Sequence, residues 1–220
     1  MPDKPPALPR GLYAIVDDGR IALADWLPFT RALLGAGCKT VQFRAKKSQG
    51  REVVEVLKMA VQACRAASAL ALVNDRADWA LVAGADGVHL GDADIPLEVA
   101  RAVLGPAAVL GFTARTPEAV VHAERAGAHY VGVGPVFASQ TKSGHAKLLG
   151  IEGLAAVVRA ARLPVVAIAG IDETNIAQVS ATGTHAAAVA AGLGTLNDVS
   201  TRARNLEEAF LRGSTTLGPP

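Results

Sequence analysis

Short apolar segments alternate with longer amphipathic segments along the chain. The apolar segments are four to six residues long, and most are bounded by glycine or polar residues. Segments of this length are typical of strands that are buried on both faces of a sheet. They occupy residues 12–16, 40–43, 70–73, 87–90, 108–112, 130–134, 165–169 and 185–190.

Between most of these segments, apolar residues recur with the period of an α-helix. In the segment 52–64, for example, Val53, Leu57, Val61 and Cys64 fall on one side of such a helix. Strands that alternate with helices are expected to pair in parallel through crossover connections. Eight such units in 220 residues predict a single α/β domain, a closed (βα)₈ TIM barrel.

An open, doubly wound sheet is the alternative fold. Its dinucleotide-binding form carries a GxGxxG motif after the first strand, whereas residues 17–22 read DDGRIA. A recurring glycine supports closure instead, because it precedes every even-numbered strand with a period of roughly 45 residues, the length of a double βα unit, although the last interval is 56 residues. These glycines are Gly37, Gly84, Gly127 and Gly183.

The barrel is expected to span residues 11–212. Residues 1–10 are rich in proline and lack the apolar segment of a signal peptide, so they are predicted to form an N-terminal extension. Residues 213–220 are predicted to form a flexible C-terminal tail.

Charge and cysteine usage exclude several classes of partner. The chain has 22 Lys+Arg against 20 Asp+Glu, so it lacks the basic excess of a nucleic-acid-binding protein. No apolar stretch reaches the 18 residues of a membrane span. Cys38 and Cys64 provide neither a disulfide framework nor a metal-ligand spacing, and Cys64 is expected to be buried. A cytoplasmic protein with small-molecule ligands is predicted.

Polar residues follow the predicted strands. In a βα barrel the active site lies at the carboxyl ends of the strands, where the βα loops converge. Residues at these ends are therefore expected to share one site. They are Asp17 and Asp18; Gln42, Arg44, Lys46 and Lys47; Asn74, Asp75 and Arg76; Asp92 and Asp94; Thr113; Ser139, Gln140, Thr141 and Lys142; Ala169 and Gly170; and Ala190, Ala191 and Gly192.

This set of side chains is suited to polyanionic ligands. Asp75 and Asp94 follow neighbouring strands, and Mg²⁺ prefers such sites, with one or two carboxylates completed by water and substrate phosphate. Arg44, Lys46 and Lys142 supply positive charge around them. The glycine-rich turns after the last two strands allow backbone amides to approach a second phosphate.

Structural roles compete with these assignments. A single aspartate at a strand end is as well explained by a helix cap or by an ion pair with Arg76, and we favour that explanation for Asp92. His89 lies inside a strand and is interpreted as a packed, hydrogen-bonded side chain rather than a catalytic base. Convergence at one rim distinguishes Asp75 and Asp94 from such structural residues.

Four motifs resemble those of the thiamine-phosphate synthase family. VQFRAKK (41–47) is similar to its QxREK segment, and the long stretch 73–94 to its NDRxDxAxxxGADGVHLGQxD. GVGPVFASQTK (132–142) is similar to GxGPxxxTxTK, and VVAIAGI (165–171) to the phosphate-binding IGGI turn. The resemblance extends from about residue 11 to about residue 210, nearly the whole chain.

The resemblance implies a reaction and a role for each matching residue. Hydroxymethylpyrimidine diphosphate and thiazole phosphate would be joined to give thiamine phosphate and pyrophosphate, with Mg²⁺ as cofactor. Arg44, Thr113 and Lys142 would act at the reacting centre, and Asp75 and Asp94 would hold the metal. Substrate binding would fall to Gln42, Arg44, Lys46, Asn74, Thr113, Ser139, Thr141, Lys142, Gly170, Ala190 and Ala191.

The chain departs from the family pattern at several positions. Ala45 replaces the acidic residue of REK, Ala169 the first glycine of the GG turn, and Ala190-Ala191 the usual Ile-Ser. Weaker binding of thiazole phosphate is therefore expected before any loss of the chemistry. The alternatives are a thiazole tautomerase, which carries a histidine where this chain has Pro135, and a non-catalytic binder of thiazole phosphate. The sequence is silent on oligomeric state, although barrels of this type often form homodimers.

Overall fold

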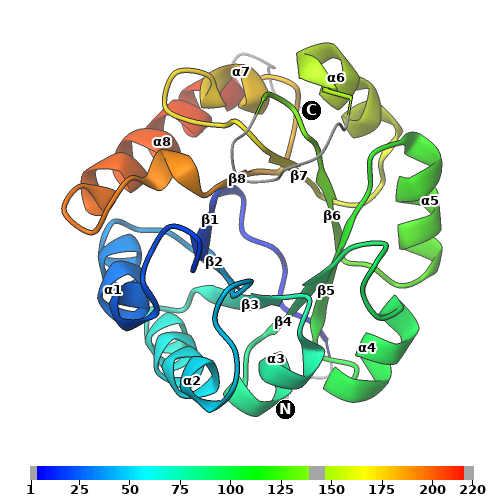
Figure 1. Cartoon of the computed structure of the whole chain (residues 1–220). Helices are drawn as coiled ribbons and strands as arrows, with labels where there is room; N and C mark the ends of the chain where they lie inside the picture. The colour runs from blue at the N-terminus through cyan, green and yellow to red at the C-terminus, as the bar shows by residue number, and fades with distance from the viewer. Residues whose placement is uncertain (1–3, 139–146, 216–220) are drawn as a thin grey trace.

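The computed structural model describes residues 4–138 and 147–215, and they form a closed barrel of eight parallel strands surrounded by helices (Figure 1). Each strand pairs with the next in the sequence, and β8 pairs with β1, so the predicted (βα)₈ fold is confirmed. The strands are β1 (Gly11–Asp17), β2 (Thr40–Arg44), β3 (Leu70–Asn74), β4 (Gly87–Leu90), β5 (Val109–Thr113), β6 (Tyr130–Val133), β7 (Val165–Ile168) and β8 (Ala186–Val189).

Helices follow the strands and cover the outside of the barrel, as the amphipathic segments predict (Figure 1). The segment predicted from 52–64 belongs to a helix one residue longer at its start and two at its end. The helices are α1 (Trp26–Gly35), α2 (Arg51–Ala66), α3 (Ala77–Ala83), α4 (Leu97–Leu104), α5 (Pro117–Arg125), α6 (Gly150–Ala160), α7 (Ile176–Ser180) and α8 (Val199–Ser214), with the short 3₁₀ helices η1 (Leu23–Asp25) and η2 (Ala191–Leu193).

The four recurring glycines all have the backbone conformation that closes a helix. Their φ angles lie between +67° and +94°, a region that a residue without Cβ adopts at little cost. Gly84 shows the arrangement directly, because it is the C-cap of α3 and its amide donates to the Leu81 carbonyl. The glycines therefore end α1, α3, α5 and α7 just before the even-numbered strands.

Two apolar cores hold the barrel together. The larger core fills the space between strands and helices and contains Cys64, which is buried as predicted. The smaller core fills the barrel interior and includes Leu8 from the predicted N-terminal extension. The Leu8 carbonyl accepts a hydrogen bond from His185 Nε2 at 2.8 Å. Helix α8 continues to Ser214, two residues beyond the predicted end of the barrel domain.

Among the described residues, no helix has the length and apolar character needed to cross a membrane.

The described ionisable groups include one histidine, His129, whose surroundings make the stability of the fold depend on pH. Burial lowers the pKa of His129, and the nearby Arg101 guanidinium lowers it further. The Leu110 amide donates to His129 Nδ1 at 2.9 Å, which requires that nitrogen to be unprotonated.

We expect the folded protein to lose stability as the pH falls below about 6.5, the ordinary pKa of histidine. The folded state disfavours protonated His129, whereas the unfolded chain takes up the proton at that pH. Its contribution is therefore fully present above the unfolded-state pKa and is lost as the pH decreases. Urea unfolding at pH 7.5 and 5.5 would measure this, and His129→Gln should reduce the difference. The exposed His122 provides the control, because His122→Gln should leave the difference unchanged.

Candidate active site

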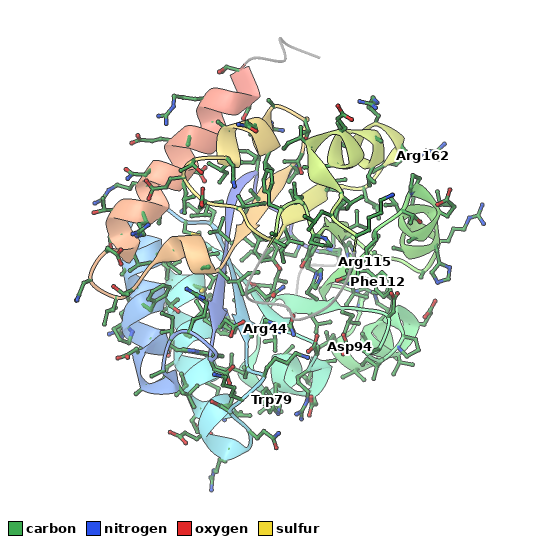
Figure 2. All side chains as sticks on the ribbon, turned by 45° about the horizontal axis from the view of Figure 1, so that its top comes forward. Arg44, Trp79, Asp94, Phe112, Arg115 and Arg162 are labelled. Atoms are coloured by element: carbon green, nitrogen blue, oxygen red, sulfur yellow. The ribbon has the colours of Figure 1, made fainter. Side chains whose placement is uncertain are left out.

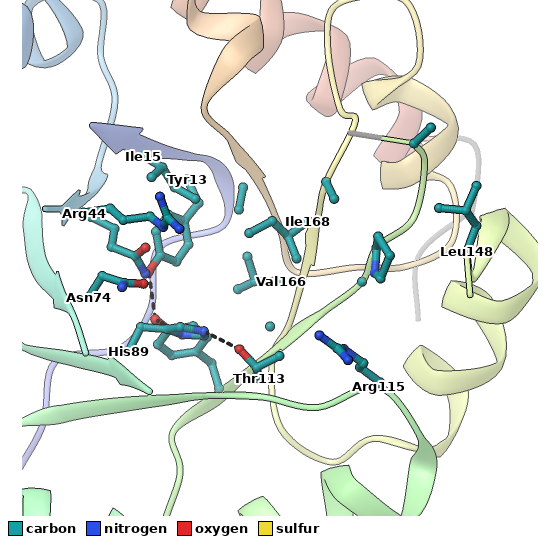
Figure 3. Close-up of a pocket in the computed structure, with 18 residues that line it drawn as sticks. Tyr13, Ile15, Arg44, Asn74, His89, Thr113, Arg115, Leu148, Val166 and Ile168 are labelled. Atoms are coloured by element: carbon teal, nitrogen blue, oxygen red, sulfur yellow. Dashed lines mark hydrogen bonds between the residues drawn. The ribbon is translucent and has the colours of Figure 1, made fainter. Parts of the chain in front are cut away.

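Two cavities open beside each other at the carboxyl ends of the strands. Their volumes are about 360 Å³ and 480 Å³. Every strand contributes to the wall of the first cavity (Figure 3). The second cavity is lined mainly by β1, β7, β8 and the loops that follow them, together with Arg44 of β2, Ala138 and Arg202 of α8. A ligand in one cavity would border a ligand in the other, because the two share part of their lining. The shared residues are Ile15, Arg44, Ala138, Ile168, Ala169 and Ala188.

A chain of hydrogen bonds crosses the floor of the first cavity (Figure 3). Gln42 Nε2 donates to the Tyr13 hydroxyl at 2.7 Å, and that hydroxyl lies 2.8 Å from the Tyr130 hydroxyl. His89 Nδ1 is 3.0 Å from the Tyr130 hydroxyl, and His89 Nε2 is 3.0 Å from Thr113 Oγ1. The hydrogen-bonded role predicted for His89 is confirmed, and the same contacts hold Gln42 and Thr113 at the cavity wall.

Arg44 reaches both cavities from the end of β2, where a buried carboxylate holds it. Its Nη1 lies 2.5 Å from Asp17 Oδ2 at the end of β1, and Asp17 is 2% exposed. The other Asp17 oxygen accepts from the Gly19 amide at 2.7 Å. The pair lies across neighbouring strands in register, since Asp17 is the β1 partner of Arg44. Arg44 is therefore fixed in direction, and its charge is balanced by Asp17.

The two predicted metal ligands lie together beside the first cavity. Asp75 follows Asn74, which lines that cavity, and it forms an ion pair with Lys46. Burial raises the pKa of the Asp75 carboxyl; Lys46 lowers it, and the neighbouring Asp94 carboxyl raises it. Asp94 Oδ2 accepts from the Gly91 amide at 2.8 Å. The two carboxyl groups are thus close enough to interact, as the site prediction requires.

The aspartates near this pair have other roles. Arg76 binds Asp78 through two hydrogen bonds and lies over the Trp79 ring, so its guanidinium is engaged away from Asp75. Asp92 is exposed, whereas Asp94 is half-buried. The structure therefore brings Asp75 and Asp94 together and leaves Asp92 on the surface.

The donor set fits a hard cation that needs few protein ligands. Over the part of the chain that the structure describes, no group of three or more His, Cys, Asp or Glu residues could hold a metal. Zinc sites normally use three or four such ligands, whereas Mg²⁺ is bound by one or two carboxylates plus water and substrate phosphate. Asp75 and Asp94 meet the requirement of Mg²⁺.

The loop that carries Lys46 is held by Asp18. The Asp18 carboxylate accepts from the backbone amides of Lys46 at 2.9 Å, Lys47 at 2.8 Å and Ser48 at 2.5 Å. Partial burial alone would raise the pKa of Asp18, but these donors lower it below the ordinary value. The carboxylate fixes the start of the loop from which Lys46 reaches Asp75.

The predicted residues of the second cavity lie together as well. Gly170, Ala190 and Ala191 all line it, and Ala191 begins η2. Gly170 has a φ of +68°, and a Cβ atom there would lie 2.5 Å from the Ala138 carbonyl oxygen. The remaining predicted site residues, Ser139, Gln140, Thr141 and Lys142, lie outside the described residues.

The comparisons place the chain in a family. The thiamine monophosphate synthase family profile matches residues 12–193, which include both cavities apart from Arg202. The chain belongs to the thiamine monophosphate synthase family. It is 45% identical over 208 residues to thiamine-phosphate synthase from Myxococcus xanthus, covering 94% of this chain and 95% of that protein. The corresponding protein from Anaeromyxobacter dehalogenans is 41% identical over 208 residues, with coverage of 94% and 91%.

A solved structure agrees with this assignment. Thiamine phosphate pyrophosphorylase from Pyrococcus furiosus superposes with a TM-score of 0.82 at 34% identity, covering 92% of this chain and 96% of that one. The resemblance of the sequence motifs to the thiamine monophosphate synthase family is confirmed, as is the barrel that it implies.

Some residues of the site were not predicted. Tyr13 and Tyr130 were assigned only to apolar strand segments, although they form the centre of the hydrogen-bonded chain. Arg20 and Arg115 line the second and first cavities. Arg115 follows the predicted Thr113 by two residues, and that proximity is the signal that could have identified it. Figure 2 shows Arg44, Asp94 and Arg115 inside the ring of helices.

Ala169, which stands where the family pattern has glycine, has a backbone conformation that favours glycine. Its φ is +83°, and this backbone conformation costs a residue other than glycine about 1–2 kcal/mol because the Cβ atom crowds the neighbouring backbone. Because Ala169 lines both cavities, the methyl group forms part of their shared wall. The turn after β7 is therefore locally strained at Ala169.

Ala169→Gly should stabilise the fold by about 0.5–1 kcal/mol, since relief of the strained φ exceeds the chain entropy that glycine adds. The thermal midpoint should rise by roughly 1–4 °C. Gly170→Ala is the opposing variant, and we expect it to destabilise by about 1–3 kcal/mol because its Cβ would meet the Ala138 carbonyl. A lower midpoint for Ala169→Gly would contradict the assignment of strain to Ala169.

Proposed function

We propose that this protein joins hydroxymethylpyrimidine diphosphate to thiazole phosphate, forming thiamine phosphate and releasing pyrophosphate. The observation that carries the proposal is the shared wall of the two cavities, because a reaction that couples two substrates needs adjoining sites for them. Membership of the thiamine monophosphate synthase family supports the same activity.

The first cavity suits the pyrimidine and the second suits the thiazole phosphate. Gln42 and Asn74 offer amide groups to a heterocycle in the first cavity, and Thr113 offers a hydroxyl near the opposite wall. Gly170 and the backbone of Ala190 and Ala191 would receive the thiazole phosphate in the second. Arg44 lies between the cavities, where the diphosphate and the thiazole meet.

The chemistry needs no protein nucleophile. The bond between the pyrimidine methylene carbon and the diphosphate oxygen breaks, and its electron pair leaves with pyrophosphate. The aminopyrimidine stabilises the carbocation that remains, and the thiazole nitrogen forms the new bond to the methylene carbon. The protein contributes orientation of the two rings and positive charge at the departing oxygen. Arg44, Lys46 and Lys142 are the residues to which we assign that charge.

Asp75 and Asp94 are the proposed ligands of Mg²⁺. When bound there, the metal would neutralise negative charge on the diphosphate and make pyrophosphate a better leaving group. The closeness of the two carboxyl groups and the ion pair between Asp75 and Lys46 support this placement. Lys46 balances Asp75 and would remain beside the diphosphate.

The decisive assay combines purified protein with both substrates and Mg²⁺ and measures pyrophosphate and thiamine phosphate together. Equal amounts of the two products are expected, with none when either substrate is omitted and little after chelation of the metal. A thiazole tautomerase would convert a single thiazole substrate without releasing pyrophosphate. A non-catalytic binder would take up thiazole phosphate and form no product, and either result would overturn the proposal.

Pro135 supports the synthase over the tautomerase. It lines the first cavity at the position of the histidine expected in a tautomerase, and a proline side chain cannot transfer a proton. A cytoplasmic location and a homodimer stay predictions. The two buried free cysteines are compatible with a reducing compartment, and sedimentation of the purified protein would determine its oligomeric state.

A further inference from the structure

The arginines that line the two cavities differ in whether a carboxylate balances them. Arg44 pairs with Asp17, and Arg202 pairs with Asp198 at 2.5 Å and lies 3.9 Å from Glu173. Arg115 and Arg20 have no ion pair or side-chain hydrogen bond among residues 4–138 and 147–215. Each cavity therefore contains one arginine whose positive charge is not balanced within the described structure.

Arg115 is the unbalanced arginine of the first cavity. It follows β5, and Figure 3 shows its guanidinium directed into the cavity near Thr113. It lines the first cavity and not the second. Arg44 enters the same cavity from β2, on the other side of the barrel. An anion held there would meet Arg44 on one side and Arg115 on the other.

Arg20 occupies the corresponding position in the second cavity. It lies in the turn after β1, and Asp17 holds that turn by accepting from the Gly19 amide through Oδ1 and from the Arg20 amide, at 2.9 Å, through its carbonyl. The Asp17 carboxylate thus balances Arg44 while its backbone helps to present Arg20. Arg20 does not line the first cavity.

The second cavity has few other groups for a phosphate. None of its described lining residues carries a side-chain hydroxyl. Its acidic residues are Asp17, paired with Arg44, and Asp172, whose Oδ1 accepts from the Thr174 amide and hydroxyl. Arg202 is engaged by Asp198 and Arg44 by Asp17, so among the described lining residues Arg20 is the guanidinium that no carboxylate engages.

We propose that Arg115 and Arg20 each bind one of the two anionic substrates, one in each cavity. This proposal rests on the function proposed above. Arg115 binds the diphosphate of the pyrimidine substrate, and Arg20 binds the phosphate of the thiazole substrate. A guanidinium can donate two parallel hydrogen bonds to phosphate, so each contact supplies geometry as well as charge. Each arginine is then a specificity determinant for one substrate only.

Steady-state kinetics of Arg115→Ala and Arg20→Ala test the division, because each variant is the matched control for the other. Loss of a charged hydrogen bond to phosphate should raise KM by about 10- to 100-fold. Arg115→Ala should raise KM for the pyrimidine diphosphate and leave KM for thiazole phosphate nearly unchanged, and Arg20→Ala should do the reverse. Equal effects on both KM values, or no effect, would overturn the proposal. Arg31→Ala, an exposed change on α1, should alter neither KM.

Calorimetry of thiazole phosphate binding separates this proposal from the proposed function. The titration uses protein without Mg²⁺ or the pyrimidine substrate, and it is repeated with the dephosphorylated thiazole alcohol. Wild-type protein should prefer the phosphate, and Arg20→Ala should lose about 10- to 100-fold of that preference while Arg115→Ala keeps it. If Arg20→Ala retains the preference, the assignment of Arg20 is wrong even when the protein is an active synthase. A normal Arg20 effect in a protein that releases no pyrophosphate would instead overturn the proposed function.

Discussion

Asp75→Ala should reduce pyrophosphate release by about 10³-fold or more at ordinary Mg²⁺ concentrations while the protein stays folded. The variant removes one of the two proposed metal ligands and leaves Lys46 without its partner. Burial and Asp94 raise the pKa of Asp75 despite its ion pair with Lys46, so the fold gains little from the ionised carboxylate. Pyrophosphate release over a range of Mg²⁺ concentrations, together with urea unfolding, would measure both effects.

Neighbouring carboxylates provide the controls for this variant. Asp94→Asn should lower turnover in the same direction, because Asp94 lies against Asp75. Asp92→Asn should have a much smaller effect, since Asp92 is exposed. Equal losses at Asp92 and Asp94, or an unfolded Asp75→Ala protein, would contradict the assignment of Asp75 and Asp94 as the metal ligands.

Arg44→Ala should lower turnover by about 10²–10³-fold and also destabilise the fold by about 3–5 kcal/mol. The loss of activity follows from the charge that Arg44 supplies at the junction of the cavities. The loss of stability has a different cause, because Asp17 would remain buried with its charge unbalanced. Measurements of kcat, KM and the free energy of unfolding are all needed to separate the two effects.

A double variant distinguishes them. Arg44→Ala combined with Asp17→Asn removes the unbalanced charge, so most of the stability should return while turnover stays low. Recovery of turnover in the double variant would mean that Arg44 serves only to neutralise Asp17. Arg44→Lys keeps the charge without the two-pronged donor geometry, and it should lie between wild type and Arg44→Ala.

The strands could be predicted from the sequence because they are buried on both faces. The first predicted segment, 12–16, lies within β1 (Gly11–Asp17), and the second, 40–43, lies within β2 (Thr40–Arg44). A strand covered by helices outside and side chains inside is apolar along its length. Such a strand can be recognised from its own residues, without knowing which strands lie beside it. The alternation of these strands with helices then predicted that neighbouring strands pair in parallel.

The contacts within the site depend on registers that the sequence pattern does not reveal. Asp17 meets Arg44 because the β1–β2 register places them opposite each other, although they are 27 residues apart in sequence. The contact between Tyr13 and Tyr130 spans 117 residues and crosses the barrel interior. Strand ends could therefore identify candidate residues such as Asp75 and Arg44, but not the ion pairs that balance their charge.

The hydrogen-bonded chain from Gln42 to Thr113 has one polarity in which each hydroxyl both accepts and donates. Burial raises the pKa of Tyr13 and of Tyr130, so both hydroxyls keep their protons. If the Tyr13 hydroxyl, which accepts from Gln42, donates to Tyr130, then the Tyr130 hydroxyl can donate in turn to His89 Nδ1.

This polarity selects one tautomer of the imidazole. In that arrangement His89 Nδ1 accepts, a neutral imidazole carries its hydrogen on Nε2, and that hydrogen is directed at Thr113 Oγ1. The Thr113 hydroxyl thereby receives a hydrogen bond and keeps its own proton available for the first cavity. In that arrangement a side-chain amide on β2 is linked through three aromatic rings to a hydroxyl on β5 that faces a ligand as a donor.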